Sequence, residues 1–220
     1  MPTPEIERRW REAVRGRADE IEAAGASFTD VLRLMAHLRS ADGCPWDREQ
    51  SLASLRQYVR EEADEVCEAI DRILALEEEL RHRHGQPPAD PSPPAGQDKA
   101  RTSKKGHTIG HHPHRDDFDA AVSASGAPLP AELTAEQQRE LDGLYRELYK
   151  ELGDLLLQAA FQGDILHAMG RPGVGHSLEL LIGKLIHRHP HVYGNRQVAD
   201  SAEVLRNWEE IKRDEGSSCG

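Results

Sequence analysis

The chain carries two short acidic motifs, EEADE at residues 61–65 and ELGD at residues 151–154. Each lies in a region of helical periodicity, and residues three apart on a helix point the same way. Two such motifs on facing helices can bring four carboxylates to one point. Carboxylates this close repel one another unless a divalent cation binds, and an all-oxygen site suits Mg²⁺, with Mn²⁺ as a substitute.

The apolar pattern separates the members of the first motif. At 100° per residue, Glu62 falls inside the apolar stripe of its helix, between Val59 and Val66. Glu65 lies at the edge of that stripe and Glu61 on the far side. An ionised carboxylate in an apolar stripe is costly unless it is paired or binds a metal.

In the second motif, Glu151 and Asp154 share one edge of an apolar helix face. The alternative for both motifs is ordinary solvated charge, because Arg and Lys residues stand within a helical turn. A di-iron oxidase also gathers carboxylates in a bundle, but that class uses Glu-x-x-His, which neither motif has. Hard-cation chemistry on a phosphorylated substrate is favoured.

Helices must position these motifs. Apolar spacing predicts helices at residues 5–24, 27–39, 52–80, 135–169, 176–188 and 201–214. Gly43 and Pro45 break the pattern at residues 41–47. No segment alternates convincingly as a strand, so the expected fold class is all-α. From Leu152 onward the helix at 135–169 is apolar on both faces, which predicts that two subunits associate.

Residues 84–131 differ from the rest, with clusters of Gly, Pro, Ser and His and almost no large apolar residues. Such a composition buries too little area to offset its ordering entropy, so a disordered insertion is expected. The alternative for its histidines is an adventitious transition-metal site. The expected organisation is an N-terminal helix at 1–26, one domain at 27–215 interrupted by this insertion, and a disordered tail at 216–220.

Bulk properties narrow the classes of partner. The formal net charge of −11 argues against a broad nucleic-acid surface. No apolar run is long enough for a transmembrane helix and the N-terminus has no signal core, so no membrane association is expected. Three cysteines without metal-ligand spacing indicate free thiols and a cytoplasmic protein. Cys67 has no base pattern around it that would favour a nucleophile.

Several segments resemble the MazG family. They are EExxE and ExxD themselves, GCPWDREQS at 43–51, KLIHRHPHVYG at 184–194 and VLRNWEEIKRDE at 204–215. Their order is far more specific than the acidic motifs alone. The resemblance implies a four-helix-bundle fold, an intertwined homodimer, and magnesium-dependent hydrolysis of nucleoside triphosphates to nucleoside monophosphate and pyrophosphate.

The resemblance also implies roles for individual residues. The magnesium ligands would be Glu62, Glu65, Glu151 and Asp154. Catalysis would involve Glu62 as a ligand and Glu61 as the group that orients or deprotonates the attacking water. Substrate contacts would come from Trp46, Asp47, Lys150, Lys184, Arg188, Trp208 and Lys212. For the two tryptophans, packing in the core is the alternative.

Two other functions compete with this interpretation. One is a related all-α pyrophosphatase acting on dUTP, dCTP or phosphoribosyl-ATP. The GCPWD and HPHVYG segments favour the MazG family over these enzymes. The other is a non-catalytic dimeric helical module that binds partners. The intact set of carboxylates argues against the second, because a decayed site tolerates other residues.

Overall fold

The structure, a computed structural model, describes residues 2–87, 129–130 and 132–217. These residues form helices and connecting turns with no strand among them, which confirms the predicted all-α class. They divide into two compact units. One, here called the hairpin unit, contains the described residues of 17–91 and 115–176; the other, the terminal unit, contains those of 1–16 and 177–220.

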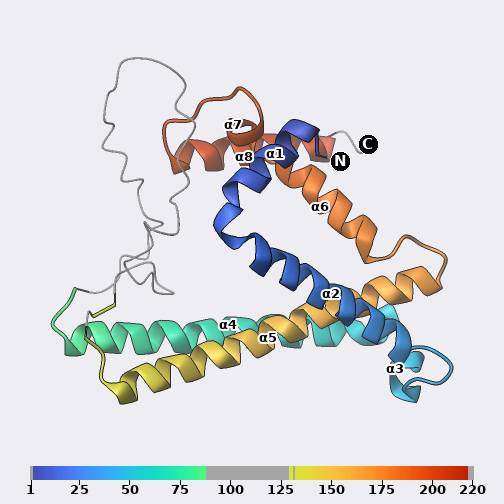
Figure 1. The fold of residues 1–220 in the computed structure, drawn as a ribbon, viewed down its shortest axis with the longest axis horizontal. Coiled ribbons are helices and arrows are strands. Elements are labelled where there is room, and N and C mark those ends of the chain that lie inside the picture. The colour runs from blue at the N-terminus through green and yellow to red at the C-terminus, as the bar shows by residue number, and fades with distance from the viewer. Residues whose placement is uncertain (1, 88–128, 131, 218–220) are drawn as a thin grey trace. The chain divides into compact units, whose positions relative to one another are not determined.

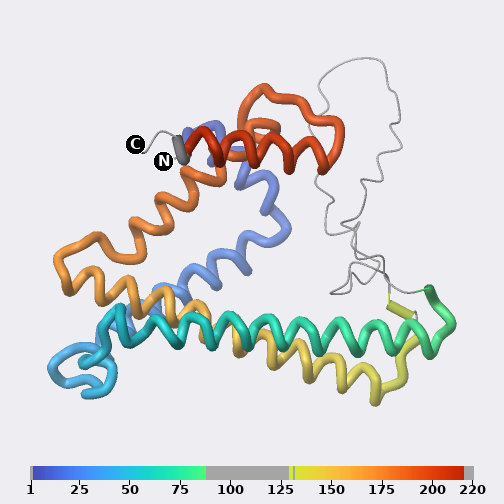
Figure 2. Tube along the Cα trace, turned by 180° about the vertical axis from the view of Figure 1, so that it is seen from behind, coloured from blue at the N-terminus to red at the C-terminus, as the bar shows by residue number. Residues whose placement is uncertain are grey.

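Two long helices make up most of the hairpin unit. Helices α4 (Leu52–Arg83) and α5 (Ala135–Ala168) lie side by side and run in opposite directions (Figures 1 and 2). Each starts at a capping box: Ser51 pairs reciprocally with Ser54, and Thr134 with Gln137. These side chains satisfy backbone N–H groups that have no partner within the first turn, so both helix starts are well defined.

A third long helix, α2 (Ala18–Leu38), packs against α5. Two hydrophobic clusters result, one where α2, α4 and α5 meet and one towards the other end of the hairpin. The first contains Met35, Leu55, Phe161 and Ile165, and the second contains Ile73, Leu76, Leu80 and Leu141. Both acidic motifs fall between these clusters along α4 and α5, so packing on either side holds the carboxylate-bearing turns together.

The terminal unit contains α1 (Pro4–Ala13), most of α6 (Val174–Arg188), α7 (Pro190–Tyr193) and α8 (Ser201–Ser217). Trp10 Nε1 donates a hydrogen bond to Tyr193 Oη at 2.9 Å, and the guanidinium of Arg9 donates to the carbonyl of Val192 at 2.8 Å. These contacts attach α1 to α7, although the two lie far apart in the sequence.

The predicted break between residues 24 and 27 was wrong. Helix α2 runs through Gly25, because one glycine in a helix interior costs only about 1 kcal/mol. The chain instead interrupts its helices at Arg15–Arg17, a single 3₁₀ turn. A short helix, α3 (Pro45–Glu49), occupies part of the expected loop at 41–47.

The predicted insertion at 84–131 lies mostly outside the described residues. Near its end, however, Leu129 packs against the second hydrophobic cluster, a contact that the composition did not predict. Among the helices that the structure describes, none combines the length and apolarity needed to cross a bilayer.

Candidate functional site

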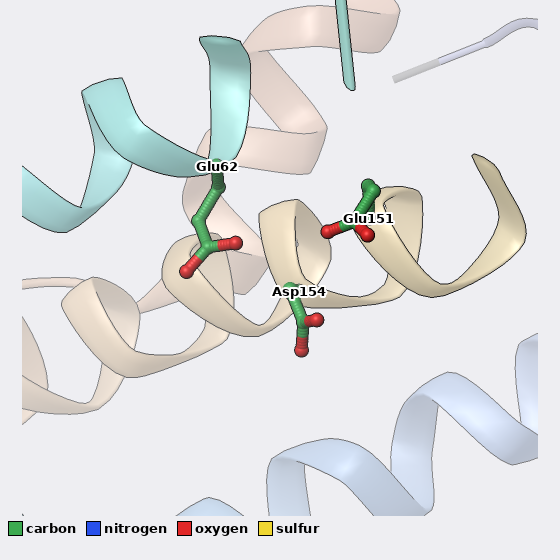
Figure 3. Close-up of side chains that lie close together, drawn as sticks. All are labelled: Glu62, Glu151 and Asp154. Carbon is green, nitrogen blue, oxygen red and sulfur yellow. The ribbon is translucent and has the colours of Figure 1, made fainter. Parts of the chain in front are cut away.

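Three carboxylates from α4 and α5 converge in the hairpin unit. Oxygen atoms of Glu62, Glu151 and Asp154 all lie within 4.8 Å of one another. Figure 3 shows Glu62 reaching from α4 towards the turn of α5 that carries the other two. The structure thus brings together both acidic motifs, which are about 90 residues apart in the sequence.

The remaining acidic residues of the first motif lie at the margin of this cluster. The carboxyl of Glu65 lies close enough to that of Glu151 to raise its pKa, so it adjoins the three converging groups. Glu61 is exposed, and its charge acts on Glu62. The order of burial along this turn, with Glu62 half-buried and the other two exposed, follows the apolar stripe of the sequence.

The electrostatics of the cluster fit a cation site. Burial raises the pKa of Glu62 above its ordinary value of 4.5, and the charges of Asp154, Glu151 and Glu61 raise it further, whereas a hydrogen bond with Gln158 lowers it. The pKa of Glu151 is also raised, first by burial and then by Glu65. Burial and neighbouring negative charge thus disfavour the ionised form of both carboxylates, and a hard divalent cation would offset these effects.

A tightly anchored loop brings Trp46 and Asp47 beside the carboxylates. Gly43 packs so closely on the preceding helix that a Cβ there would lie 2.2 Å from the Leu38 carbonyl oxygen. This close approach explains why a residue without a side chain stands at this position. The guanidinium of Arg39 donates hydrogen bonds to the carbonyls of Asp47 and Gln50. The C-terminal half of α3 is thereby held against the end of α2.

Arg39 is itself fixed by α5. Its Nε lies 2.7 Å from Asp164 Oδ2, and its guanidinium stacks over the Phe161 ring with 5.3 Å to the centroid. Only 11% of the Arg39 side chain is exposed. No pattern in the sequence predicts this pair, because its partners are 125 residues apart and neither residue type is distinctive on a helix surface.

A pocket of about 220 Å³ opens between α2, α3, α4 and α5. Its lining includes Trp46 and Asp47, predicted to form part of the site wall, and also Glu62 of the carboxylate cluster. Half of the Trp46 surface is exposed, so this side chain is not a core residue of the chain. Gln158, one turn after Asp154, also lines the pocket and was not among the predicted site residues.

The predicted phosphate-facing cations are mostly in the terminal unit. There, Arg188 and Lys212 stack on the same Trp208 ring, at 5.5 and 5.3 Å from its centroid. Arg188 also forms a bidentate ion pair with Glu215, which lowers the pKa of that carboxyl. Lys184 is exposed on the same helix as Arg188. Whether this group faces the carboxylates of the hairpin unit stays a prediction.

Lys150 was also predicted to face phosphate. It is exposed on α5, and its Nζ lies 2.8 Å from Glu147 Oε1. The structure therefore pairs this lysine with a neighbour on its own helix, and its contact with substrate stays a prediction as well. Exposed pairs of this kind are weak, so a phosphate could displace the carboxylate.

Comparison with known proteins identifies similar sequences. Residues 131–193 match the family model of the MazG nucleotide pyrophosphohydrolase domain. The chain is 27% identical over 186 residues to the nucleoside triphosphate pyrophosphohydrolase of Escherichia coli, covering 84% of this chain and 44% of that protein. It is 26% identical over 195 residues to the nucleoside triphosphate pyrophosphohydrolase/pyrophosphatase MazG of Thermotoga maritima, covering 89% and 48%.

A third relative is the uncharacterized protein YabN of Bacillus subtilis, 26% identical over 188 residues, with 86% of this chain and 24% of that protein covered. The chain thus spans between about a quarter and about a half of the length of these relatives. No solved structure matches. The family match includes Glu151, Asp154, Lys184 and Arg188, whereas the first acidic motif precedes it.

Proposed function

We propose that this chain, of which residues 131–193 match the MazG nucleotide pyrophosphohydrolase domain model, hydrolyses nucleoside triphosphates to nucleoside monophosphate and pyrophosphate. One observation carries the proposal: Glu62, Glu151 and Asp154 converge within 4.8 Å from two helices. The relatives named as nucleoside triphosphate pyrophosphohydrolases support the same reaction. In it, the oxygen of a water attacks the α-phosphorus, the bond to the bridging oxygen breaks, and pyrophosphate leaves.

The metal ligands would be Glu62, Glu65, Glu151 and Asp154, holding Mg²⁺ or, as a substitute, Mn²⁺. Their all-oxygen donor set suits a hard cation, and the pKa values of Glu62 and Glu151 are raised by burial and by neighbouring carboxylates, which a cation would offset. A bound magnesium ion would neutralise charge that develops on the phosphate oxygens and would help to order the attacking water.

Other residues of the chain would position the attacking water and bind the phosphates and the nucleotide. Glu61, exposed beside the cluster, would orient the water or take its proton. Arg188 can grip phosphate oxygens through two N–H groups, whereas Lys184 and Lys212 act as point charges. The Trp208 ring, on which two of these cations stack, would contact the nucleotide.

We further propose a homodimer. Several large apolar side chains on one face of α5 are left uncovered in the single chain, with 40% of Leu152, 55% of Leu156 and 69% of Tyr149 exposed. An uncovered apolar face of this kind is typical of a surface that another subunit buries.

The reaction is tested with a panel of ribo- and deoxyribonucleoside triphosphates in Mg²⁺, scoring pyrophosphate against orthophosphate. We expect pyrophosphate and one equivalent of monophosphate, with loss of turnover in EDTA. Exclusive release of orthophosphate would contradict the proposal. Including dUTP, dCTP and phosphoribosyl-ATP separates a general enzyme from a specialised one, and no release from any substrate would favour a non-catalytic module.

A further inference from the structure

The pocket beside the carboxylates has a composition that suits a flat ring. Three aromatic side chains, Trp46, Tyr58 and Phe161, form part of its wall. The Trp46 ring meets the other two nearly edge-on, with centroid distances of 6.0 Å to Tyr58 and 6.5 Å to Phe161. Most of the remaining lining is aliphatic, so a planar, weakly polar group would be favoured there.

The size of the pocket limits what enters it. Its volume of about 220 Å³ is below the range of roughly 300–1,000 Å³ typical of sites that enclose a whole drug-sized molecule. One heterocycle fits such a space better than an entire nucleotide. Because Glu62 belongs both to the pocket wall and to the carboxylate cluster, the pocket and the proposed phosphate site share one side chain.

Gln158 supplies a specific polar contact in this apolar wall. Only 8% of this residue is exposed, and its side-chain amide lies close enough to Glu62 to favour the ionised form of that carboxyl and so lower its pKa. An ionised carboxylate only accepts hydrogen bonds, so the amide must present its NH₂ group to Glu62. Its oxygen, Oε1, is then left free, and it has no hydrogen-bond partner among the described residues.

A buried acceptor without a partner is unusual, because most buried polar atoms are hydrogen-bonded. Here it lies in the wall of a pocket, next to the proposed site, where a bound group could reach it. The most direct explanation is that the missing donor belongs to the substrate.

Building on the proposed function, we infer that this pocket receives the nucleotide base and that Gln158 selects bases carrying an N–H donor. The Oε1 atom would accept a hydrogen bond from an exocyclic amino group or a ring N–H. A site built to bond such a group rejects an analogue that lacks it, because the buried acceptor is again left unpaired.

Matched substrate pairs test the inference directly. ATP is compared with purine riboside triphosphate, and CTP with pyrimidin-2-one riboside triphosphate; in both pairs only the amino group is lost. UTP is compared with N3-methyl-UTP, which blocks a ring N–H. For the pair whose parent is the best substrate, we expect kcat/KM to fall about 10- to 100-fold on loss of the donor. Equal kcat/KM within every pair would overturn the inference without any mutation.

The substitution Gln158→Met keeps the length of the side chain and removes the amide. We expect the discrimination within the best pair to shrink to about 2-fold or less, even if turnover falls for every substrate. The matched control is Gln162→Met, one turn further along α5 and outside the pocket lining, which should keep the discrimination of the unmodified chain. If discrimination survives in Gln158→Met, the amide is not the selecting group.

The two failures are distinguishable. If no parent triphosphate yields pyrophosphate, the proposed function fails. If the parents are hydrolysed but the pairs behave alike, the function stands and only the role of Gln158 is wrong.

Discussion

The substitution Glu62→Gln keeps the shape of the side chain and removes its negative charge. If Glu62 is a metal ligand, this change forfeits stabilisation of the charge that develops during phosphoryl transfer. We expect turnover to fall by at least about 100-fold, which corresponds to about 2.7 kcal/mol of activation free energy. The measurement is the rate of pyrophosphate release at saturating nucleotide and magnesium.

The same substitution should stabilise the metal-free protein. At the 4.8 Å that bounds the oxygens of the cluster, two unit charges repel by about 1 kcal/mol in water and about 3 kcal/mol at an effective dielectric constant of about 20. Glu62 is half-buried next to solvent, so we take the lower value. A gain of about 1 kcal/mol in EDTA would raise Tm by about 2–4 °C for a chain of this size.

The gain should depend on pH with a definite sign. The pKa of Glu62 in the folded chain lies above 4.5, so the folded state holds this proton more tightly than the unfolded state. Metal-free stability from this group is therefore lost as pH rises through the raised pKa. The difference in Tm between Glu62→Gln and the unmodified chain should be small at pH 4 and largest near pH 8.

The control is Glu68→Gln, which removes an exposed carboxylate from the same helix outside the cluster. It should alter neither turnover nor Tm appreciably. Wild-type turnover and magnesium dependence in Glu62→Gln would refute the site. Loss of turnover without any gain of stability in EDTA would refute the electrostatic reasoning alone.

Three further predictions concern other parts of the chain. The protein should be a dimer at micromolar concentration by light scattering, and Leu156→Glu should shift it towards the monomer; a monomeric mass of the unmodified chain would contradict this. Arg188 lowers the pKa of Glu215, so the contribution of ionised Glu215 to the stability of the folded chain is lost as pH falls through that lowered pKa. In Glu215→Gln, the midpoint of urea unfolding should therefore depend less on pH on the acid side than in the unmodified chain. Replacing residues 90–127 by a short Gly/Ser linker, while keeping Leu129, should preserve the helical circular dichroism and the activity; loss of either would show that the segment is structural.

The sequence was sufficient to predict the carboxylate-bearing helices. The stripe that includes Glu62 has its partners within two turns, so the spacing alone indicates which acidic residue is drawn towards the protein interior. The first residues of α4 and α5 could be approximated for the same reason, since the N-capping residues Ser51 and Thr134 bond to backbone N–H groups within the next four residues.

Contacts between distant segments could not be predicted in this way. Gln158 looks unremarkable in the sequence, and its importance depends on α2 and α3 closing a pocket over it. The pair of Arg39 and Asp164 likewise needs two helices to meet before either residue is distinctive. A signal was available for Gln158, because it lies four residues after Asp154, on the same face of the helix.

The two apolar faces that the sequence predicts for α5 have different surroundings in the structure. Helix α5 is apolar on both sides from Leu152 onward, but the two sides differ. The side with Phe161 packs against α2 and α4, whereas the side with Leu152 and Leu156 is exposed. At 100° per residue, Glu151 and Asp154 fall towards the packed side. The proposed subunit association and the proposed chemistry would therefore use different faces of one helix. Leu156→Glu should accordingly weaken the dimer more than it weakens magnesium binding by the monomer, measured by calorimetry; if both are lost together, the partner subunit completes the metal site.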